Sequence, residues 1–533
     1  MIRFEKIATA VFICALLLSF MTTWLSLLMP QGPPTWDGSE HSFHGLRIYY
    51  ALKTSDFQMF KQFTLEQTMW PFLHSWILGM TFCVLSPGFS SARLVSLLLW
   101  SMTAVLTFIL GRRLTRSEYK NVSGLLAGAV VITSPMFVQY SVQPMLEVPG
   151  AFLTMLVMIT LTSRNDFKWP NSLAAGCVLG LLFFLKYAYA QLFIASFIGF
   201  VLFEIVFRHS SQDSVVSRVT CLGISTISFL TPVIIAAALW FSRSDALQGY
   251  LVCLQNPESG LSFWSLYNWI LYPVILILYY FASPLMAVVV LAYSFVPQRG
   301  ISLPARRLVN AYILVSLLIL TVYHYKLARA VFTILPFIAA SDCAKIVDCA
   351  AGASQGKKQV WGRFCIILVV VHLPLLFYPK SYQIMNPLLK VEFRHMTTFD
   401  RELQTALIDV SRRLKDERVD AVIGDSHNIS PPLISWYLCE AGNVFPRRIP
   451  TLLRWDNKLD GFKLDDLMSA RGFHSCLVIR IATNSILETQ DYIDNYAWMS
   501  RRLILPNTEN RLKLVWTQGY NNGVSFEYYQ RSR

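Results

Sequence analysis

Repeated apolar runs, each long enough to cross a lipid bilayer, are the feature of this 533-residue chain that most restricts its fold. The first run covers residues 7–29, and similar runs recur as far as residue 378. A helix of about 20 apolar residues can span the hydrocarbon core because its backbone hydrogen bonds are satisfied internally. Hydrophobic residues make up 54% of the chain and charged residues only 15%, which excludes an ordinary soluble protein. We therefore predict an α-helical polytopic membrane protein.

Short basic clusters between the apolar runs predict the orientation of the chain. Arg3 and Lys6 precede the first run, and no small-residue cleavage site is evident, so we expect a retained signal-anchor and a cytoplasmic N-terminus. Placing the later clusters in alternate cytoplasmic loops gives about eleven crossings and an external C-terminus. The net charge of +14 therefore indicates membrane topology and not a nucleic-acid partner. The predicted spans are residues 7–29, 90–110, 122–140, 145–161, 171–186, 188–207, 219–241, 267–296, 308–323, 328–346 and 361–378.

Two apolar segments do not have the pattern of a simple span. Residues 71–85 are shorter than a full crossing requires and contain His74, so we expect them to be re-entrant or to lie at the interface. Residues 267–296 are longer than one span requires, and Pro273 and Pro284 predict kinks within them.

The composition becomes that of a soluble domain near residue 381. Apolar residues recur at helical spacing after Asp400, which predicts a helix. Three further segments are typical of strands, namely residues 421–423, 476–479 and 512–516. We expect residues 1–380 to form a transmembrane domain and residues 381–533 to form an extracytoplasmic α/β domain.

The ten cysteines are scattered, mostly within the predicted spans, and have no CxxC or other paired ligand spacing. They therefore give no indication of metal or redox chemistry. Cys439 and Cys476 both fall in the predicted external domain. Their presence there is compatible with a disulfide or with two separate core thiols.

A polar segment follows the first apolar run and brings together two carboxylates and two imidazoles, those of Asp37, Glu40, His41 and His44. Glu40 and His44 are four residues apart and would share a helix face, with Asp37 one turn earlier. This spacing is adequate for a divalent cation, although substrate hydrogen bonding and ordinary loop packing are alternatives, and we assign no metal ligand. For Asp37, the alternative to a chemical role is N-capping of a helix over residues 39–52.

Four cationic side chains lie at predicted outer ends of spans, against the positive-inside trend: Arg93, Lys186, Lys326 and Arg329. A cation at the centre of a bilayer costs about 2.5–3.5 kcal/mol, so such groups usually extend to the headgroups or meet an anion. We expect these four to bind a lipid phosphate, and simple anchoring at the headgroups is the alternative. Further candidates for the same pocket are His41, His44, His74, Glu147, Tyr187 and His324. Glu147 could instead pair with Lys186 or Arg329.

Several short patterns, taken in order, resemble the GT-C membrane glycosyltransferases of the protein O-mannosyltransferase and aminoarabinose transferase type. They are an Asp-containing first outer loop, WPFLH at 70–74, SARL at 91–94, LGRRL at 110–114, the stretch 140–149, FLKY at 184–187 and KLAR at 326–329. The resemblance covers roughly residues 7–350. It implies a GT-C fold, with about eleven transmembrane helices, a catalytic first outer loop at about 30–89 and the C-terminal soluble α/β domain.

The resemblance further implies transfer of a single sugar, with inversion, from a polyprenyl-phosphate donor to an extracytoplasmic acceptor. Asp37 matches the acidic position of the family, which usually has Glu immediately after it, whereas this chain has Gly38. Glu40 is therefore the second catalytic candidate. Some relatives use a divalent metal and others do not, so a metal cofactor is compatible with the resemblance.

The expected partners are the polyprenyl-phosphate sugar, membrane lipid and a glycan, lipid or protein acceptor. We expect the bacterial inner membrane, with the active site facing the periplasm, because no retention signal and few glycosylation sequons are present. A transporter or flippase of lipid-linked sugars would share the cations, as would a non-catalytic lipid-binding scaffold. Neither alternative should depend on one carboxylate for turnover.

Overall fold

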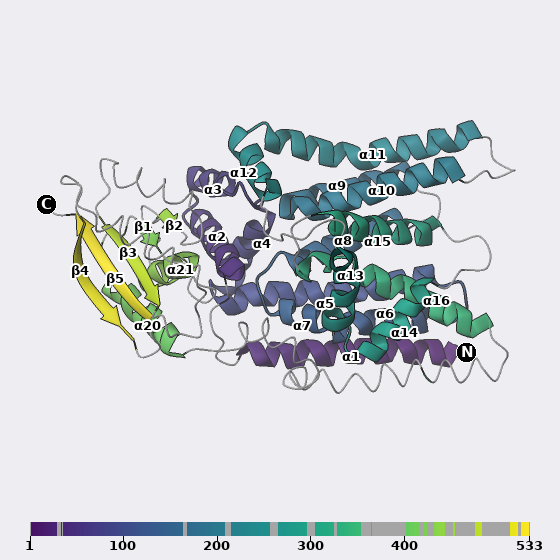
Figure 1. Cartoon of the computed structure of the whole chain (residues 1–533), viewed down its shortest axis with the longest axis horizontal. Coiled ribbons are helices and arrows are strands. Elements are labelled where there is room, and N and C mark those ends of the chain that lie inside the picture. Colours follow the sequence, from purple (N-terminus) through teal and green to yellow (C-terminus); the bar gives the residue numbers. More distant parts are fainter. Residues whose placement is uncertain are drawn as a thin grey trace. The chain divides into compact units, whose positions relative to one another are not determined.

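The computed structural model describes residues 2–28, 34, 36–163, 168–207, 215–255, 265–295, 304–323, 328–352, 364, 401–414, 417, 419, 421–423, 431–442, 451–453, 475–481, 512–520 and 524–531. This part of the chain is mostly helical and includes one five-stranded sheet (Figure 1). It forms two compact units. Unit 1 comprises residues 1–27, 64–74 and 93–389, and unit 2 comprises residues 28–63, 75–92 and 390–533. The expected boundary at residue 380 lies outside the described residues and stays a prediction.

Unit 1 is a helical bundle in which α9, α10 and α11 pack side by side (Figure 1). Its first helices are α1 (Ile2–Leu28), α5 (Phe89–Leu114), α6 (Lys120–Thr133), α7 (Pro135–Ser141), α8 (Glu147–Leu161), α9 (Trp169–Leu185) and α10 (Tyr187–Phe207). They are followed by α11 (Val215–Phe241), α12 (Ser244–Gln255), α13 (Leu266–Ile275), the π-helix η1 (Leu276–Tyr280), α14 (Pro284–Ala292), η2 (Tyr293–Phe295), α15 (Pro304–Val322), η3 (Ala328–Val331) and α16 (Leu335–Gly352).

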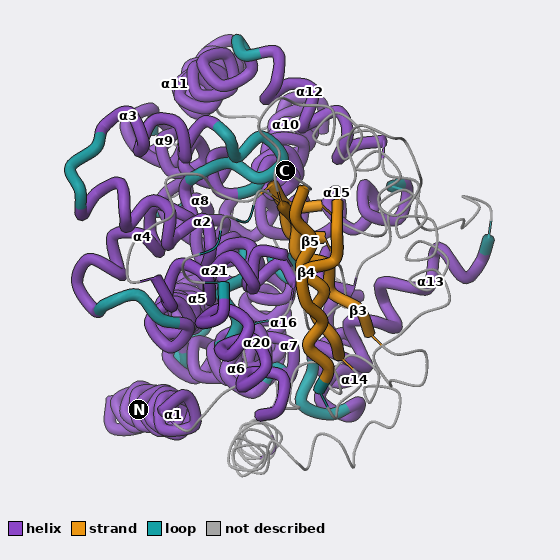
Figure 2. Tube along the Cα trace, turned by 90° about the vertical axis from the view of Figure 1, so that its left-hand side faces the viewer, coloured by secondary structure: helices purple, strands orange, loops and turns teal. Residues whose placement is uncertain are grey.

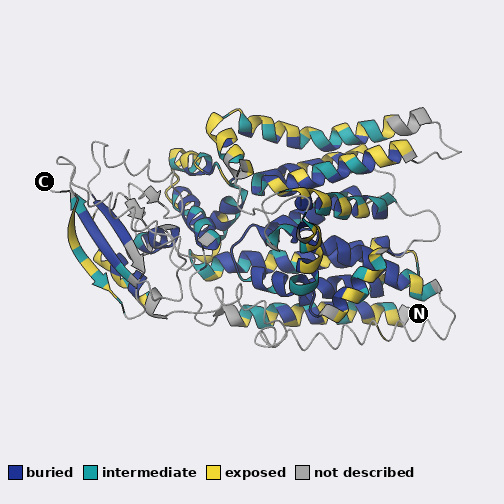
Figure 3. Cartoon of the chain, viewed as in Figure 1, coloured by how far each residue is buried: buried dark blue, intermediate teal, exposed yellow. Residues whose placement is uncertain are grey.

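Exposed apolar side chains mark the surface that this bundle presents to lipid. On α11, Ile227, Ile234 and Leu239 are 67%, 60% and 70% exposed, whereas residues 122–133 of α6 are buried throughout (Figure 3). A soluble monomer rarely exposes such a row of large apolar residues, whereas a bilayer covers it. The chain is therefore an integral membrane protein.

Within the described residues, five helices are long and apolar enough to cross a membrane. The number is six if α6 and α7, which meet at a bend of 63°, form one broken span. Shorter apolar helices occur at Leu73–Leu85, Glu147–Leu161, Trp169–Leu185 and Asn268–Tyr280. The predicted count of about eleven crossings stays a prediction, because the segment 361–378 lies almost entirely outside the described residues.

The kinks predicted in residues 267–296 are confirmed as a broken helix. Pro273 lies inside α13 and lacks the N–H that an α-helix uses there, and the chain changes to the π-helix η1 at Leu276. A bend then separates η1 from α14, which begins with Pro284. Ser283 caps α14 because its hydroxyl oxygen accepts a hydrogen bond from the Met286 N–H at 3.2 Å.

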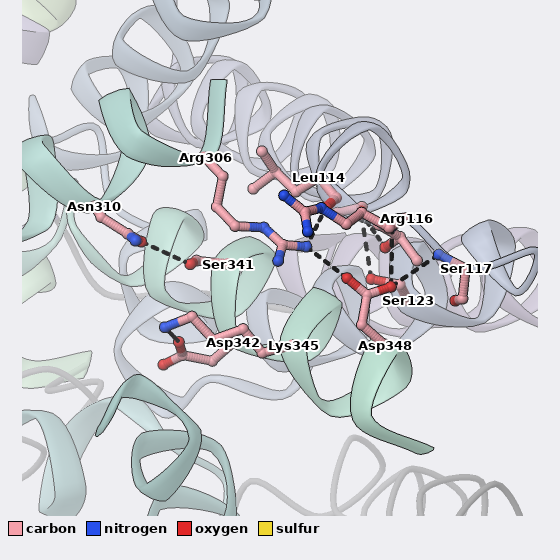
Figure 4. A network of polar contacts seen from close by, with 12 residues as sticks. Leu114, Arg116, Ser117, Ser123, Arg306, Asn310, Ser341, Asp342, Lys345 and Asp348 are labelled. Carbon is pink, nitrogen blue, oxygen red and sulfur yellow. Dashed lines mark hydrogen bonds and ion pairs between the residues drawn. The ribbon is translucent and has the colours of Figure 1, made fainter. Parts of the chain in front are cut away.

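A buried arginine joins three elements at one end of unit 1 (Figure 4). Arg306, which is 1% exposed, donates to the carbonyl of Leu114 at the end of α5 and to Asp348 Oδ2 on α16 at 2.8 Å. Asp348 Oδ1 accepts from the backbone N–H groups of Arg116 and Ser117, each at 2.9 Å. The ion pair therefore also satisfies backbone groups that the end of α5 leaves unpaired.

Two further polar contacts lie along α16 in the same view (Figure 4). The Ser341 hydroxyl donates to Asn310 Oδ1 at 2.9 Å, and Lys345 Nζ lies 3.2 Å from Asp342 Oδ1. Charged groups within an apolar bundle are costly unless they are paired, and here each charge meets its counter-ion one turn away or on the neighbouring helix.

Replacing Arg306 with Met should lower the thermal stability of the purified full-length protein. The substitution leaves the Asp348 carboxylate without its buried cation and removes a donor from the Leu114 carbonyl, and breaking a buried ion pair usually costs about 3–5 kcal/mol. Thermal unfolding of the detergent-solubilised protein measures the change in Tm. Lys120→Met, at an exposed position that starts α6, is the matched control and should leave the Tm nearly unchanged. Equal Tm values for the two variants would contradict the role assigned to Arg306.

Unit 2 combines the helices of the predicted first outer loop with the C-terminal α/β region. Its helices are α2 (Trp36–Lys53), most of α3 (Phe57–Leu65) and of α4 (Leu73–Leu85), α20 (Arg401–Arg413) and α21 (Pro431–Gly442). Its strands are β1 (Ala421–Ile423), β2 (Thr451–Leu453), β3 (Ser475–Ile481), β4 (Leu512–Gly519) and β5 (Val524–Arg531). The strand order is β2-β1-β3-β5-β4, in which β1 is parallel to β2 and β3, and β5 is antiparallel to β3 and β4. Figure 2 labels β3, β4 and β5 of this sheet.

The secondary structure predicted for the C-terminal region is largely confirmed. The three predicted strands correspond to β1, β3 and β4, and the helix expected after Asp400 is α20. Its residues Ala406, Leu407 and Val410 are buried, as the helical spacing predicted. Strands β2 and β5 were not predicted. The β2 segment is short, and β5 alternates Phe526 and Tyr528 with polar residues of which Glu527 is buried.

The two cysteines of this region are separate buried thiols, so the alternative of a disulfide is wrong. Cys439 lies on α21 and Cys476 on β3. Burial raises the pKa of the Cys439 thiol to about 12, and the nearby Arg47 opposes this shift only in part. The thiol therefore stays protonated and has no nucleophilic character at neutral pH.

Candidate functional site

Helix α2 carries the acidic and imidazole residues expected in the reaction site. It begins at Trp36, earlier than the predicted start at residue 39, so Asp37 lies in its first turn and not at the N-cap position. The interpretation of Asp37 as the N-cap is therefore wrong. A carboxylate in the first turn is still favoured by the helix dipole. Asp37 is half-buried and His41 is 5% exposed.

Glu40, His44 and Arg47 follow one another along the same face of α2. His44 Nε2 lies 3.9 Å from Glu40 Oε1, and Arg47 Nη1 lies 3.5 Å from His44 Nδ1. A guanidinium has only donors, so Nδ1 serves as the acceptor and the neutral ring carries its proton on Nε2, towards Glu40. Arg47 is 6% exposed and its guanidinium lies 4.1 Å from the centre of the Phe63 ring. Arg47 was not among the predicted site residues, although its helical spacing from His44 is visible in the sequence.

A close crossing with α4 holds α2 in place. A Cβ atom at Gly45 would lie 2.6 Å from Leu78 Cβ, and one at Gly79 would lie 2.6 Å from Ile48 Cγ2 and 2.8 Å from Ile48 Cβ. These distances are shorter than van der Waals contact, so the crossing requires glycine on both helices. The crossing therefore fixes the direction of the face that carries Asp37 and Glu40.

Helix α21 of the C-terminal region also packs on α2 within unit 2. Trp436 stacks on Phe89 with ring centres 4.5 Å apart and meets Phe82 of α4 edge-on at 5.8 Å. Such aromatic pairs contribute beyond the area that they bury. The C-terminal region thus contacts helices of the predicted first outer loop within unit 2.

Gly79→Ala should destabilise unit 2 and reduce any activity that depends on α2. The added methyl group would overlap Ile48, and overpacking of this kind typically costs about 1–3 kcal/mol. Thermal unfolding should show a Tm several degrees lower than that of the unmodified protein. Gly88→Ala is the control because the nearest atom to its new Cβ, Ser91 Oγ, is 4.0 Å away. An unchanged Tm for Gly79→Ala would contradict the close crossing.

A second group of predicted residues meets in unit 1. Glu147 is 1% exposed, and its Oε1 atom lies 3.0 Å from Lys186 Nζ and 3.7 Å from Arg329 Nε. The alternative in which Glu147 pairs with these cations is therefore realised with both of them. The three side chains carry a summed formal charge of +1. A partly buried cluster with this charge has the sign that suits an anionic phosphate.

Local structure explains how the three residues reach one place. Glu147 is the first residue of α8, where the helix dipole favours an acid. Lys186 is the extended residue between α9 and α10, and Arg329 lies in η3. The loop before α8 is tied down, because the Ser96 hydroxyl donates to the Gln143 carbonyl at 2.6 Å.

Two aromatic rings flank Lys186. Its Nζ atom lies 4.7 Å from the centre of the Tyr189 ring and 5.3 Å from that of Trp70. Trp70 belonged to a pattern used for the family resemblance, but neither ring was predicted to contact the lysine. The contact with Tyr189 could have been inferred, because Tyr189 is only three residues after Lys186. The contact with Trp70 could not, because it joins residues far apart in the sequence.

The remaining predicted residues have different positions. His74 is 1% exposed, and its Nε2 lies 3.4 Å from the Pro144 carbonyl, so it holds the loop that leads to Glu147. Tyr187 donates to the Thr68 carbonyl at 3.4 Å, and Arg93 is 5% exposed on α5. Lys326 and His324 lie outside the described residues. The structure thus joins Glu147, Lys186 and Arg329 in unit 1, and Glu40 with His44 in unit 2.

No group of three or more His, Cys, Asp or Glu residues that could hold a metal ion occurs in the described part of the chain. Glu40 and His44 could supply two ligands from one helix face. Divalent-metal dependence stays a prediction.

Comparisons with known proteins support the predicted resemblance. The family model for dolichyl-phosphate-mannose-protein mannosyltransferase matches residues 70–235. A search of curated proteins gave no match. The crystal structure of ArnT from Cupriavidus metallidurans bound to undecaprenyl phosphate is 11% identical, with a TM-score of 0.57 over 98% of this chain and 97% of that chain. Its apo form is 10% identical, with a TM-score of 0.59 over 98% of each chain.

The archaeal oligosaccharyltransferase AglB from Archaeoglobus fulgidus, in complex with an inhibitory peptide and a dolichol-phosphate, is also similar in structure. It is 12% identical, with a TM-score of 0.50 over 88% of this chain and 69% of that chain. The chain therefore has the fold of these solved structures, which is the GT-C fold that the resemblance implies, and the match over residues 70–235 agrees with the resemblance to the ArnT and protein O-mannosyltransferase type.

Proposed function

We propose that this protein transfers a single sugar from a polyprenyl-phosphate donor to an acceptor on the extracytoplasmic side of the membrane. The observation that carries the proposal is the partly buried cluster in which Lys186 and Arg329 share the buried Glu147. The similarity to ArnT, which was solved with undecaprenyl phosphate, supports a lipid-phosphate ligand of this kind. The positions of both cations at predicted outer ends of spans also predict binding of a lipid phosphate.

The cluster suits the chemistry of the leaving group. When the bond between the sugar and the phosphate breaks, the bonding electrons pass to a phosphate oxygen and its negative charge grows. Hydrogen bonds from Arg or Lys to such an oxygen are worth about 1.5–3 kcal/mol each. Because Glu147 already orders both cations, little reorganisation is needed when the charge develops.

Asp37 is the proposed general base, with Glu40 as the second candidate. An acceptor hydroxyl loses its proton to the carboxylate while its oxygen attacks the anomeric carbon and polyprenyl phosphate departs from the opposite face. A single displacement of this kind inverts the anomeric configuration, and it requires no covalent intermediate. Glu40 lies one turn beyond Asp37 on α2, with its Oε1 atom 3.9 Å from His44 Nε2, so it is the next carboxylate that could take the same proton.

Asp37→Asn should reduce sugar transfer by about 100-fold or more, because the amide cannot accept the proton of the acceptor. The assay follows label from a polyprenyl-phosphate sugar to an acceptor extract, with Tm as the measure of folding. Asp56→Asn, at the exposed cap of α3, is the matched control and should keep full activity. Full transfer by Asp37→Asn would overturn its role as the base. If Glu40→Gln were then inactive, Glu40 would take that role.

Arg329→Ala should weaken binding of polyprenyl phosphate by about 10- to 150-fold, in line with the loss of one charge-assisted hydrogen bond. Binding of the neutral polyprenol should change little. Titration of the purified protein with both lipids in matched detergent measures the difference. Equal losses for the two lipids would remove Arg329 from the phosphate site.

The same assays separate this proposal from its alternatives. A flippase or transporter of lipid-linked sugars would move the donor without cleaving it, and a scaffold would bind polyprenyl phosphate and leave its sugar intact. Release of polyprenyl phosphate together with labelled acceptor is therefore the outcome expected only for a transferase. Intact donor after prolonged incubation with an acceptor extract that a known relative can glycosylate would contradict it.

A further inference from the structure

Trp70 and Lys186 form a contact that the proposed reaction does not by itself require. The lysine ammonium lies 5.3 Å from the centre of the indole ring, and the Lys186 side chain is only 13% exposed. A cation within about 6 Å of a ring face is attracted to it, most strongly for Trp and more strongly when water is excluded. The indole therefore acts on the charge of Lys186 and does more than fill space beside it.

The segment that carries Trp70, residues 65–70, is held by its backbone in unit 1. Tyr187 donates to the Thr68 carbonyl at 3.4 Å, and Arg243 donates to the Leu65 carbonyl at 2.6 Å. Tyr187 in turn accepts a hydrogen bond from Trp240 Nε1 at 2.5 Å. Side chains from α10, from α11 and from the residues just after α11 therefore fix this segment where it passes Lys186.

Helix α12 approaches the same segment closely enough to require glycine. A Cβ atom at Gly249 would lie 2.8 Å from the Thr68 carbonyl oxygen and 2.9 Å from the Thr68 carbonyl carbon. Both are backbone atoms, which cannot rotate away. Two hydrogen bonds and one close approach thus determine the position of the segment, and with it the position of the indole.

The indole ring can restrain the Lys186 ammonium without occupying its hydrogen-bond donors. A lysine side chain is long and flexible, and Glu147 alone would hold it through one strong ion pair. An ammonium group has three N–H donors, and a ring face stabilises its charge without taking the place of an oxygen acceptor. The Trp70 and Tyr189 rings can therefore restrain the ammonium while donors stay available to phosphate oxygens.

We infer that Trp70 is a positioning residue that holds Lys186 ready for the phosphate of the lipid donor. This inference rests on the proposed function, because it assumes that Lys186 binds phosphate. Trp70 acts through Lys186 and not on the reacting atoms. Its aromatic face, and not only its volume, is the property required.

The test compares Trp70→Phe, which keeps a ring, with Trp70→Leu, which keeps only an apolar group. Full-length purified variants are titrated with polyprenyl phosphate and with polyprenol, and Tm is measured for each. We expect Trp70→Leu to weaken polyprenyl phosphate binding by about 3- to 30-fold and Trp70→Phe to weaken it less. Neither variant should alter polyprenol binding by a similar factor. Trp169→Leu, at the exposed start of α9, is the matched control and should bind both lipids normally.

A double-mutant cycle distinguishes positioning from general packing. In the Lys186→Ala background, Trp70→Leu should cause no further loss of phosphate binding, because the residue through which it acts is gone. Independent, multiplying losses would overturn the inference, as would equal affinities for Trp70→Phe and Trp70→Leu. If Trp70→Leu does not fold, Trp70→Met replaces it in the same comparison.

The outcomes also separate this inference from the proposed function. If the unmodified protein does not bind polyprenyl phosphate, or Lys186→Ala binds it normally, the proposed phosphate site fails. If Lys186→Ala loses binding while Trp70→Leu retains it, the phosphate site stands and only the role of Trp70 is wrong.

Discussion

Pairing of charge inside an apolar helical bundle is the constraint on which this structure depends. A buried ion without a partner would cost several kcal/mol, so helices that carry such groups must meet where their charges match. Arg306 of α15 donates to the carbonyl of Leu114, the last residue of α5, and to Asp348 of α16. These contacts join α5, α15 and α16. Glu147 meets Lys186 and Arg329, which joins the start of α8 to the α9–α10 junction and to η3. In the first arrangement one cation meets one carboxylate, whereas in the second two cations share one carboxylate.

That difference separates a structural ion pair from a candidate binding site. Asp348 uses one oxygen for Arg306 and the other for two backbone N–H groups, so its hydrogen-bonding capacity serves the fold. In the other cluster, two cations converge on a single oxygen of Glu147, and aromatic rings flank one of them. The same kinds of charged residue therefore serve the fold in one cluster and form a candidate anion site in the other. The difference is the number of cations that meet each carboxylate, one at Asp348 and two at Glu147.

Much of the architecture could be predicted from the sequence because it follows from local pattern. Apolar run length identified most of the helices of unit 1, and Pro284 marked the break before α14. Apolar periodicity identified α20, and β-branched runs identified three of the five strands. The start of α2 was misplaced because the sequence offers several possible N-cap residues in succession, Thr35, Asp37 and Ser39, and local pattern does not choose between them. The contact of Arg47 with His44 was overlooked.

The sequence by itself determined that the chain is a membrane protein, that it resembles the GT-C type, and which residues carry charge near the ends of its predicted spans. Those conclusions depend on composition, run length and the order of short motifs, which are properties of neighbouring residues. Only the tertiary structure decided that Glu147 is shared by Lys186 and Arg329, that Trp70 lies against Lys186, and that α21 packs on α2. These contacts join residues far apart in the chain. They depend on how the helices cross, and side-chain packing sets the geometry of such crossings, as at Gly79.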